Sequence, residues 1–259
     1  KTVRNNNSSR FGKMMRLHFE KSGAVAGAFI KTYLLEKSRA VAITDPERNY
    51  HVFYQLMASA PDEHKGAHLS KLKPEQVHMI NQSKCIALTG TDDADGYAKT
   101  TEAMKALGVS ADEQAQLLSL LSALLLLGNV SFEQDDNDKA FISASEALAA
   151  AEERLGCGLL TQNLTSKKMS RGGKGGQRNS VYTIEYSKSQ AEMVRDAVIK
   201  AIYTSAFDWV VTKVNAFICG TDYEKTSSLP YVGLLDIFGF ENFKLNSFEQ
   251  LCINFANEK

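Results

Sequence analysis

The sequence predicts an α/β fold that is mainly helical. Two long stretches, 110–128 and 187–218, carry apolar residues at helical spacing. A short apolar run after a proline, Tyr231–Leu235, is typical of a strand that is buried on both faces of a sheet. At 259 residues the chain can bury a sizeable core and form one or two domains. We expect three or four strands, contributed to a sheet that other segments complete.

The N-terminal part of the chain is predicted to supply a loop, two strands and a helix. Lys1–Arg10 is polar and contains three consecutive asparagines, so it favours neither helix nor strand. Lys13–Glu20 alternates apolar and polar residues, and Ala24–Leu35 is the second predicted strand. Asp45-Pro46 marks a turn, after which Glu47–Ser59 is predicted to be helical.

The middle of the chain is predicted to be helical up to a basic loop. Ser110 and Glu113 have the spacing of a capping box, ahead of an apolar helix that ends at Gly128. Ser143–Leu155 is rich in alanine and is also predicted to be helical. Thr165–Asn179 is polar, basic and rich in glycine, which predicts a surface loop.

A long amphipathic helix is predicted to follow this loop. It starts at a second capping-box spacing, Ser187 to Gln190, and ends near Ile218. One face is predicted to contain Val194, Val198, Ile202 and Trp209, the last of them in the core. The short loop 221–229 then leads to the apolar strand.

The C-terminal stretch combines a strand, two carboxylates, a glycine and a helix. Asp236 ends the strand, at the edge where open α/β sheets bind ligands. Gly239 can bring its backbone N–H close to an anion, and Glu241 follows it. From Ser247 the apolar residues recur at helical spacing, at Phe248, Leu251, Cys252 and Phe255. This order predicts a loop that senses a phosphate and moves a helix.

Several longer phrases resemble one protein family. DIFGFE at 236–241 and NSFEQLCINFANEK at 246–259 are similar to switch II and the start of the relay helix of a myosin motor. NNNSSRFGK at 5–13 is similar to the myosin switch I loop. RNYHVFYQL at 48–56 and LLLLGNVSF at 124–132 are further myosin-like phrases. The resemblance covers essentially the whole chain and implies part of a P-loop NTPase, the upper 50 kDa region of a myosin head with strands of the central sheet.

The resemblance also implies an organisation for the chain as a partial motor domain. It assigns switch I to 1–13, core strands to 14–35, a helical upper 50 kDa region to 45–220 with a surface loop at 165–183, the strand and switch II to 231–241, and the start of the relay helix to 246–259. The chain contains no G-x-x-x-x-G-K-[ST] phosphate-binding loop, and GGKGGQ at 172–177 has the wrong spacing. We expect that loop before Lys1 in a larger motor, and no ATPase activity from this segment alone.

By resemblance, the two switches contain the site residues of an actin-activated Mg-ATPase. Ser9 would offer its hydroxyl to Mg²⁺, and Asp236 would hold a water bound to Mg²⁺. Ser8 would contact the γ-phosphate of ATP and the attacking water. Asn5 would reach the phosphates through its amide, and the Gly239 N–H would bind the γ-phosphate.

A salt bridge between Arg10 and Glu241 is implied when both switches close, and it would trap the attacking water. Because the bridge forms only in the closed state, it would couple hydrolysis to the position of the relay helix. Asn254 is expected to tie that helix to the switch loop.

A regulatory site is expected at Ser180. In myosins, a surface loop at the actin interface has an acidic or phosphorylatable residue sixteen positions before a helical D-A-x-x-K motif. That motif is DAVIK at 196–200 here, which places Ser180 at the matching position. Arg171 and Arg178 precede the serine, which suits a kinase that prefers basic sites. The alternative is an ordinary loop serine.

The expected partners are an actin filament and the remainder of the myosin heavy chain, in the cytoplasmic actin cytoskeleton. Thirty basic and thirty acidic residues cancel, so the composition favours no nucleic-acid partner. No apolar run is long enough to span a bilayer, and no direct membrane contact is expected. The four cysteines lack metal-site spacing and are expected to be reduced and buried.

Other functions compete with the motor. A myosin-like pseudomotor or actin-binding scaffold without turnover stays open, although the switch residues match the active pattern. A kinesin-like motor is disfavoured, because its second switch is not rich in phenylalanine as DIFGFE is. Asp93, Asp95, Gly96 and Glu102 have a partial EF-hand spacing with Thr91 in the first position, so a helix cap explains these acids better.

Overall fold

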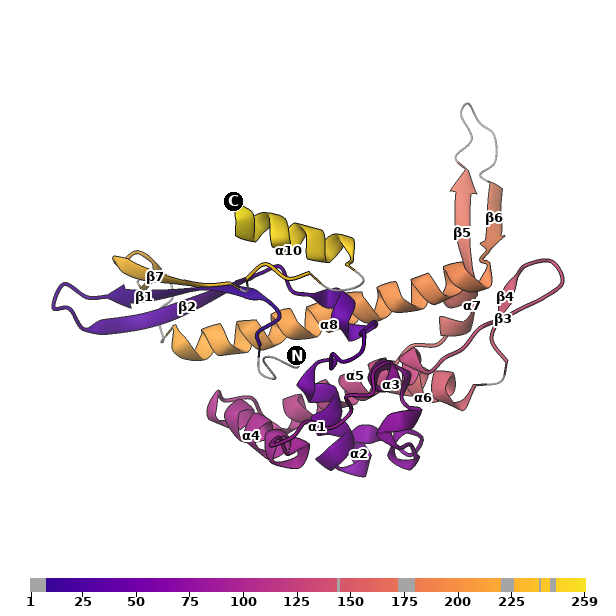
Figure 1. Cartoon of the computed structure of the whole chain (residues 1–259), viewed down its shortest axis with the longest axis horizontal. Coiled ribbons are helices and arrows are strands. Elements are labelled where there is room, and N and C mark those ends of the chain that lie inside the picture. Colours follow the sequence, from indigo (N-terminus) through magenta and orange to yellow (C-terminus); the bar gives the residue numbers. More distant parts are fainter. Residues whose placement is uncertain (1–7, 144, 172–179, 220–225, 238, 243–245) are drawn as a thin grey trace.

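The computed structural model describes residues 8–143, 145–171, 180–219, 226–237, 239–242 and 246–259 (Figure 1). They form a helical body, a three-stranded sheet and a projecting hairpin, connected by the long helix α8 (Lys188–Ile218). The sheet and the hairpin lie at opposite ends of α8, and the helical body lies along one side of it (Figure 1). Helix therefore predominates over strand, as predicted.

The main sheet is antiparallel and has the strand order β2-β1-β7. β1 (Gly12–Phe19) lies in the centre, β2 (Val25–Tyr33) follows it, and β7 (Tyr231–Asp236) joins from the other end of the chain. The three predicted strands are confirmed. The β1–β7 register pairs Lys13 with Asp236, so the residues before β1 and those after β7 leave the same edge of the sheet.

The prediction that β7 is buried on both faces is wrong. All six of its residues are exposed, and Leu234 and Leu235 are 51% and 63% exposed. β7 pairs with β1 along one side only, and no other strand in the described part of the chain lies on its other side. The apolar run therefore forms the predicted strand, but the described part of the chain does not cover it.

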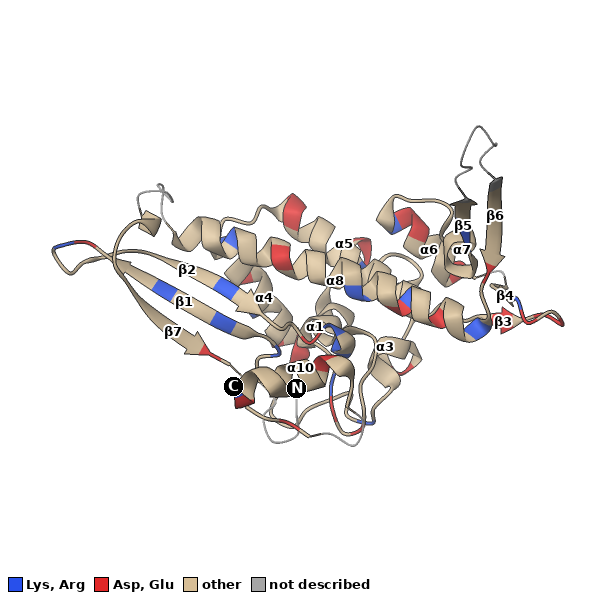
Figure 2. Ribbon diagram, turned by 90° about the horizontal axis from the view of Figure 1, so that it is seen from above, with Lys and Arg blue, Asp and Glu red and all other residues tan. Residues whose placement is uncertain are grey.

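The helix α8 begins at the predicted capping box, where the Ser187 hydroxyl accepts from the Gln190 N–H at 3.4 Å. Its buried residues are Ala191, Arg195, Ile199, Tyr203 and Ala206. The predicted face is displaced, because Val194, Val198 and Ile202 are only partly buried and Trp209 is half-buried rather than core. Small alanines let the helix approach the body, and Arg195 Nη1 donates to the Val130 carbonyl at 2.8 Å. Acidic and basic residues alternate along α8 (Figure 2).

The core lies mainly among α1 (His51–Ser59), α5 (Ala111–Gly128), α6 (Glu146–Leu155) and α8. The leucines at 124–127 on α5 are all fully buried. α5 starts at the predicted capping box and ends at Gly128, as predicted. Further helices with described bounds are α2 (Asp62–Lys65), α3 (His78–Asn81), α4 (Asp93–Ala106), α7 (Leu160–Thr165), α10 (Phe248–Glu258) and the 3₁₀ turns η1 (Lys37–Ala40), η2 (Leu69–Lys71) and η3 (Pro74–Gln76).

Two predicted helix starts are too early. α1 begins at His51 rather than Glu47, because the preceding residues bind elsewhere: Asn49 Nδ2 donates to the carbonyls of Ala40 and Met79 at 3.1 and 2.7 Å. α6 begins after Ser145, whose hydroxyl accepts from the Leu148 N–H at 3.2 Å. In both cases a polar side chain fixes the non-helical segment before the helix.

The predicted surface loop is partly a hairpin. β5 (Ser166–Arg171) pairs with β6 (Ser180–Glu185), while residues 172–179 lie outside the described part. The basic and glycine residues indicated a loop, but Val181, Thr183 and Ile184 favour a strand. A second small pair, β3 (Glu133–Gln134) with β4 (Ala140–Phe141), also went unpredicted.

A helix cap is present near position 93, but Asp92 supplies it, while Asp93, Asp95 and Glu102 lie within α4. The Asp92 side chain accepts from the Ala94 and Asp95 N–H groups at the start of α4. All four cysteines are free thiols, but only Cys219 is buried, so the expected burial is wrong for the other three. Among the described helices, none is long and apolar enough to cross a membrane.

Candidate functional site

The candidate site lies where the loop before β1 meets the loop after β7. The antiparallel pairing of these strands brings the two loops together, and the Arg10 side chain connects them. Arg10 is only 2% exposed. Phe11 fixes the start of β1 against α8, since its ring lies 4.8 Å from the Phe207 ring between centroids. A buried guanidinium therefore sits at a junction of three elements.

Arg10 binds Glu241 through a bidentate ion pair. Nη1 donates to Oε1 at 2.9 Å, and Nη2 donates to Oε2 at 2.6 Å. Two parallel hydrogen bonds fix the relative orientation of both planar groups, which a lysine could not do. The ion pair that the resemblance implied is therefore formed.

A second carboxylate, that of Glu36, binds the Arg10 guanidinium at its Nε. Arg10 Nε donates to Glu36 Oε2 at 2.6 Å, and Arg39 Nε donates to the same oxygen at 2.7 Å. Burial opposes the charge on Arg10, but hydrogen bonds and charges of Glu241 and Glu36 outweigh it and raise the Arg10 pKa. Burial also opposes the charge on Glu36, but Arg39 and Arg10 hold its pKa below the ordinary value. Arg10 and Glu36 are therefore charged at neutral pH.

The Glu241 backbone is tied to α10 through Asn254. Asn254 Oδ1 accepts from the Glu241 N–H at 3.1 Å, and Asn254 Nδ2 donates to the Glu241 carbonyl at 2.7 Å. Gln250 Nε2 donates to the same Oδ1 at 3.1 Å. The expected tie is therefore present, and a shift of the Glu241 loop must either move α10 or break these bonds.

The serines of the first loop differ in their surroundings. Arg10 Nη1 donates to the Ser8 hydroxyl at 3.3 Å, so Ser8 lies beside the ion pair. Ser9 is exposed. Asn5 lies outside the described residues. The structure thus brings Ser8 together with Arg10 and Glu241 and leaves Ser9 exposed.

Asp236 and Gly239 border open space. Lys13 Nζ lies 3.2 Å from Asp236 Oδ2, and the Asp236 side chain is 61% exposed. A Cβ placed on Gly239 would meet no atom of the other described residues within 4 Å. A hydrated cation can therefore reach the carboxylate, and an anion can approach the glycine backbone.

The oxygen donors fit Mg²⁺ with phosphate rather than a metal held by protein alone. In the described segments, no three His, Cys, Asp or Glu side chains lie close enough to hold an ion. Mg²⁺ keeps several waters and takes only one or two protein oxygens beside phosphate oxygens. The exposed Ser9 and Asp236 are donors of this kind.

Ser180 lies apart from this site. Its backbone begins β6, opposite Arg171, in the hairpin at one end of α8 (Figure 1). Arg178 and the side chain of Ser180 fall outside the described part of the chain.

Sequence reasoning missed three residues of the site. Glu36 binds Arg10, Arg39 binds Glu36, and Lys13 pairs with Asp236. The available signal was the charged sequence EKSR directly after the apolar second strand. An i,i+3 pair of this kind is usually a surface feature, so the pattern did not indicate its burial.

The family model of the myosin head (motor domain) matches residues 1–259. The chain belongs to the myosin head family. It is 41% identical over 265 residues to Myosin-6 of Arabidopsis thaliana and 40% identical over 263 residues to the myosin IB heavy chain of Dictyostelium discoideum. It is 41% identical over 261 residues to Myosin-1 of Emericella nidulans.

These matches cover 100% of the chain but only 17%, 23% and 20% of the three myosins. The resemblance found in the sequence is confirmed, and a kinesin-like motor is set aside. Because the chain spans about a fifth of these relatives, the activity and partners of a whole myosin are proposals for it.

Proposed function

We propose that this chain supplies both switches of an actin-activated Mg-ATPase, a cytoskeletal motor that couples ATP hydrolysis to movement on actin filaments. The bidentate Arg10–Glu241 pair is the observation that supports this most directly. Together with Asn254 it joins the N-terminal loop, the C-terminal loop and α10. A linkage of this kind lets closure of a site move a helix.

The proposed organisation follows the family resemblance. Switch I is residues 1–13, the core strands are 14–35, the helical upper 50 kDa region is 45–220 with a surface loop at 165–183, switch II with its strand is 231–241, and the start of the relay helix is 246–259. The P-loop of the NTPase is proposed to lie outside this segment, so residues 1–259 alone are not expected to hydrolyse ATP.

Each site residue has a proposed role toward ATP and Mg²⁺. Ser9 would hold Mg²⁺ directly and Asp236 through a water, and the bound ion would neutralise charge on the phosphates. Asn5, Ser8 and the Gly239 N–H would bind the phosphates.

The ion pair has a separate proposed role. Arg10 and Glu241 would close over the attacking water, exclude bulk solvent and, with Ser8, orient the water. The buried guanidinium and the position of Ser8 beside it support this role.

The proposed partners are an actin filament and the remainder of the myosin heavy chain, in the cytoplasmic actin cytoskeleton, with a kinase that acts on Ser180. Exposed apolar residues support packing of further heavy chain: Leu234, Leu235, Phe248, Leu251 and Phe255 are at least 51% exposed. A pseudomotor or actin-binding scaffold is not favoured, because the Arg10–Glu241 pair is intact.

The test is charge reversal in a complete head that contains this chain. Arg10→Glu or Glu241→Arg should each slow ATP hydrolysis by about a hundredfold or more, because a buried charge loses its partner. Binding of a fluorescent ATP analogue should persist. The double variant should recover part of the hydrolysis rate, as a direct pair requires.

Lys99→Glu is the control, because its ion pair with Asp95 is exposed and lies on α4. Reversing that charge should leave hydrolysis nearly unchanged. If the loss of hydrolysis rate in the double variant equals the sum of the losses in the two single variants, expressed as free energies, the proposed role of the pair is refuted.

A further inference from the structure

Arg10 lies between two carboxylates that are anchored differently. The Glu36 N–H donates to the Arg10 carbonyl at 2.9 Å, and the Tyr50 hydroxyl donates to the Glu36 carbonyl at 2.8 Å. The Glu36 carboxylate also accepts from Arg39 Nε at 2.7 Å and from Arg39 Nη2 at 3.3 Å. Glu36 is therefore fixed to the helical body by both its backbone and its side chain.

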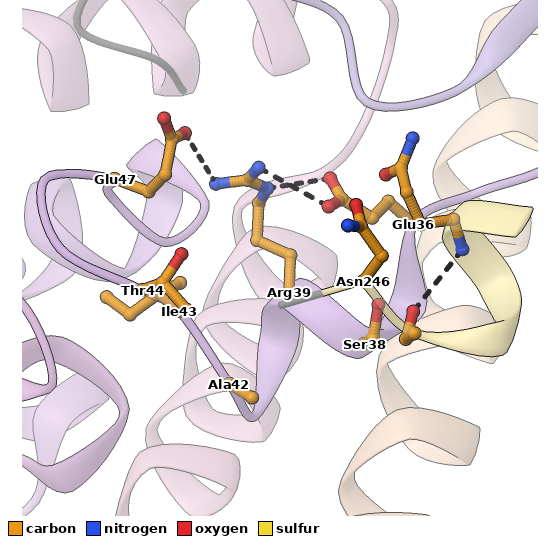
Figure 3. A pocket seen from close by; sticks show the side chains of 10 residues that line it. Glu36, Ser38, Arg39, Ala42, Ile43, Thr44, Glu47 and Asn246 are labelled. Carbon is orange, nitrogen blue, oxygen red and sulfur yellow. Dashed lines mark hydrogen bonds and ion pairs between the residues drawn. The ribbon is translucent and has the colours of Figure 1, made fainter. Parts of the chain in front are cut away.

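Glu241 is anchored to α10 instead of the body. Its side chain is 22% exposed, against 11% for Glu36, and its backbone binds Asn254. Between η1 and the start of α10 lies a pocket of about 320 Å³, bordered by Arg39 and Asn246 (Figure 3). Open space in place of close packing lets α10 and its loop shift relative to η1 at little cost.

The charges around Arg10 balance without Glu241. Arg39 lies between Glu36 and Glu47, which accept from it at 2.7 and 3.4 Å (Figure 3). If Glu241 moves away, Arg10 and Arg39 still face Glu36 and Glu47, two cations against two anions. A buried cation that loses its only counter-charge is strongly unfavourable. Glu36 therefore makes the state without the Glu241 bond accessible.

We propose that Glu36, held by Arg39, is the fixed counter-ion and positioning residue of Arg10, and that Glu241 is its exchangeable partner. Glu36 accepts a hydrogen bond from Arg10 Nε, while Arg10 Nη1 and Nη2 donate to Glu241. It retains Arg10 when Glu241 leaves and so determines how readily the ion pair opens. The inference rests on the proposed ATPase, in which a pair that encloses the attacking water also encloses the phosphate product.

The experiment compares variants of a complete head that contains this chain, by a rapid-quench phosphate burst and by the rate of subsequent phosphate release. Glu36→Gln should retain the burst but slow release by about tenfold, because opening would then break the remaining carboxylate ion pair that Arg10 forms in the described part of the chain. Glu241→Gln should lose the burst. Arg39→Gln should accelerate release, because Glu36 then pairs with Arg10 alone.

Glu47→Gln is the matched control. It removes the same charge from the same cluster, but from a carboxylate that pairs with Arg39 at 3.4 Å. Its release rate should fall much less than that of Glu36→Gln, because Glu36, the carboxylate that binds Arg10 itself, is kept. Glu36→Asp, which keeps the charge, should restore release toward the rate of the unaltered head, and thermal unfolding checks that each variant is folded.

Several outcomes overturn the inference. Loss of the burst in Glu36→Gln would mean that Glu36 is needed for closure itself. If Glu36→Gln and Glu47→Gln slow release equally, Glu36 acts only through the net charge of the cluster. If Glu36→Gln does not fold, unchanged or slower release in Arg39→Gln refutes the inference. An unaltered head without a burst would instead refute the proposed ATPase function itself.

Discussion

Arg10 shows why this position takes an arginine rather than a lysine. Its Nε faces Glu36, while Nη1 and Nη2 face Glu241, so three donors on one rigid plane serve two carboxylates. A lysine has a single ammonium group and cannot hold two carboxylates in these fixed directions. The geometry thus requires a planar group with several donors, and the Arg10 guanidinium just before β1 provides it.

At the same scale, the charge on Glu36 should make the free energy of unfolding decrease in acid. Burial opposes its charge, yet Arg39 and Arg10 lower its pKa below the ordinary value of 4.5. Such a group stabilises the folded state above its unfolded pKa and loses this contribution as pH falls through its folded pKa. Glu36→Gln should therefore lower the free energy of unfolding at pH 7 by about 3 kcal/mol.

The free energies of unfolding of the unaltered head and of Glu36→Gln should become more similar once pH falls below 4.5, the ordinary pKa of a glutamate. Thermal unfolding over a pH series measures them. Glu63→Gln is the control, because that side chain is 78% exposed and its loss should change stability little at any pH. A difference that grows in acid would contradict the assigned sign.

At the scale of elements, α10 is coupled to the site through the Asn254 side chain. Asn254→Ala removes both hydrogen bonds to the Glu241 backbone, which together contribute about 2 kcal/mol. The closed arrangement should lose that support, so the phosphate burst of a complete head should fall while binding of a fluorescent ATP analogue persists. Asn257→Ala is the matched control in the same helix, because Asn257 Nδ2 has no hydrogen-bond partner among the described residues. An undiminished burst in Asn254→Ala would exclude the coupling.

Local signals predicted the elements better than they predicted burial. The capping boxes at Ser110 and Ser187 and the end of α5 at Gly128 depend on neighbouring residues, and all three are confirmed. Burial depends on partners far away in the chain. The apolar β7 has only β1 beside it in the described part. The buried face of α8 includes Arg195, whose side chain donates to the distant Val130 carbonyl.

The same distinction applies to the site. Arg10 and Glu241 are separated by 231 residues, so no local pattern could pair them, and only the family resemblance did so. Glu36 and Arg39 are three residues apart and visible as a pair. Their role was missed because it depends on Arg10 lying against them, which is a property of the folded chain.

At the scale of the whole molecule, α8 separates the hairpin from the site. Phe207 contacts Phe11 beside the site, and the rise of an α-helix places Phe207 about 30 Å from Lys188 at the hairpin end. Interactions between exposed charges are largely screened beyond about 10 Å. A charge added to the hairpin therefore cannot act on Arg10 or Glu241 directly and must act through a partner.

Ser180 allows this separation to be tested. Phosphorylation adds roughly −1.5 to −2 charges at neutral pH, and the proposed partner at the hairpin is an actin filament. In a complete head, Ser180→Glu should raise actin-activated ATP turnover above that of Ser180→Ala, while the basal turnovers stay nearly equal. Ser170 lies in β5 opposite Val181 and provides the control, since Ser170→Glu adds the same charge to the same hairpin at a different position. Equal actin activation of Ser180→Glu and Ser180→Ala across a range of salt concentrations would exclude Ser180 from regulation, and an equal gain from Ser170→Glu would show that only the net charge matters.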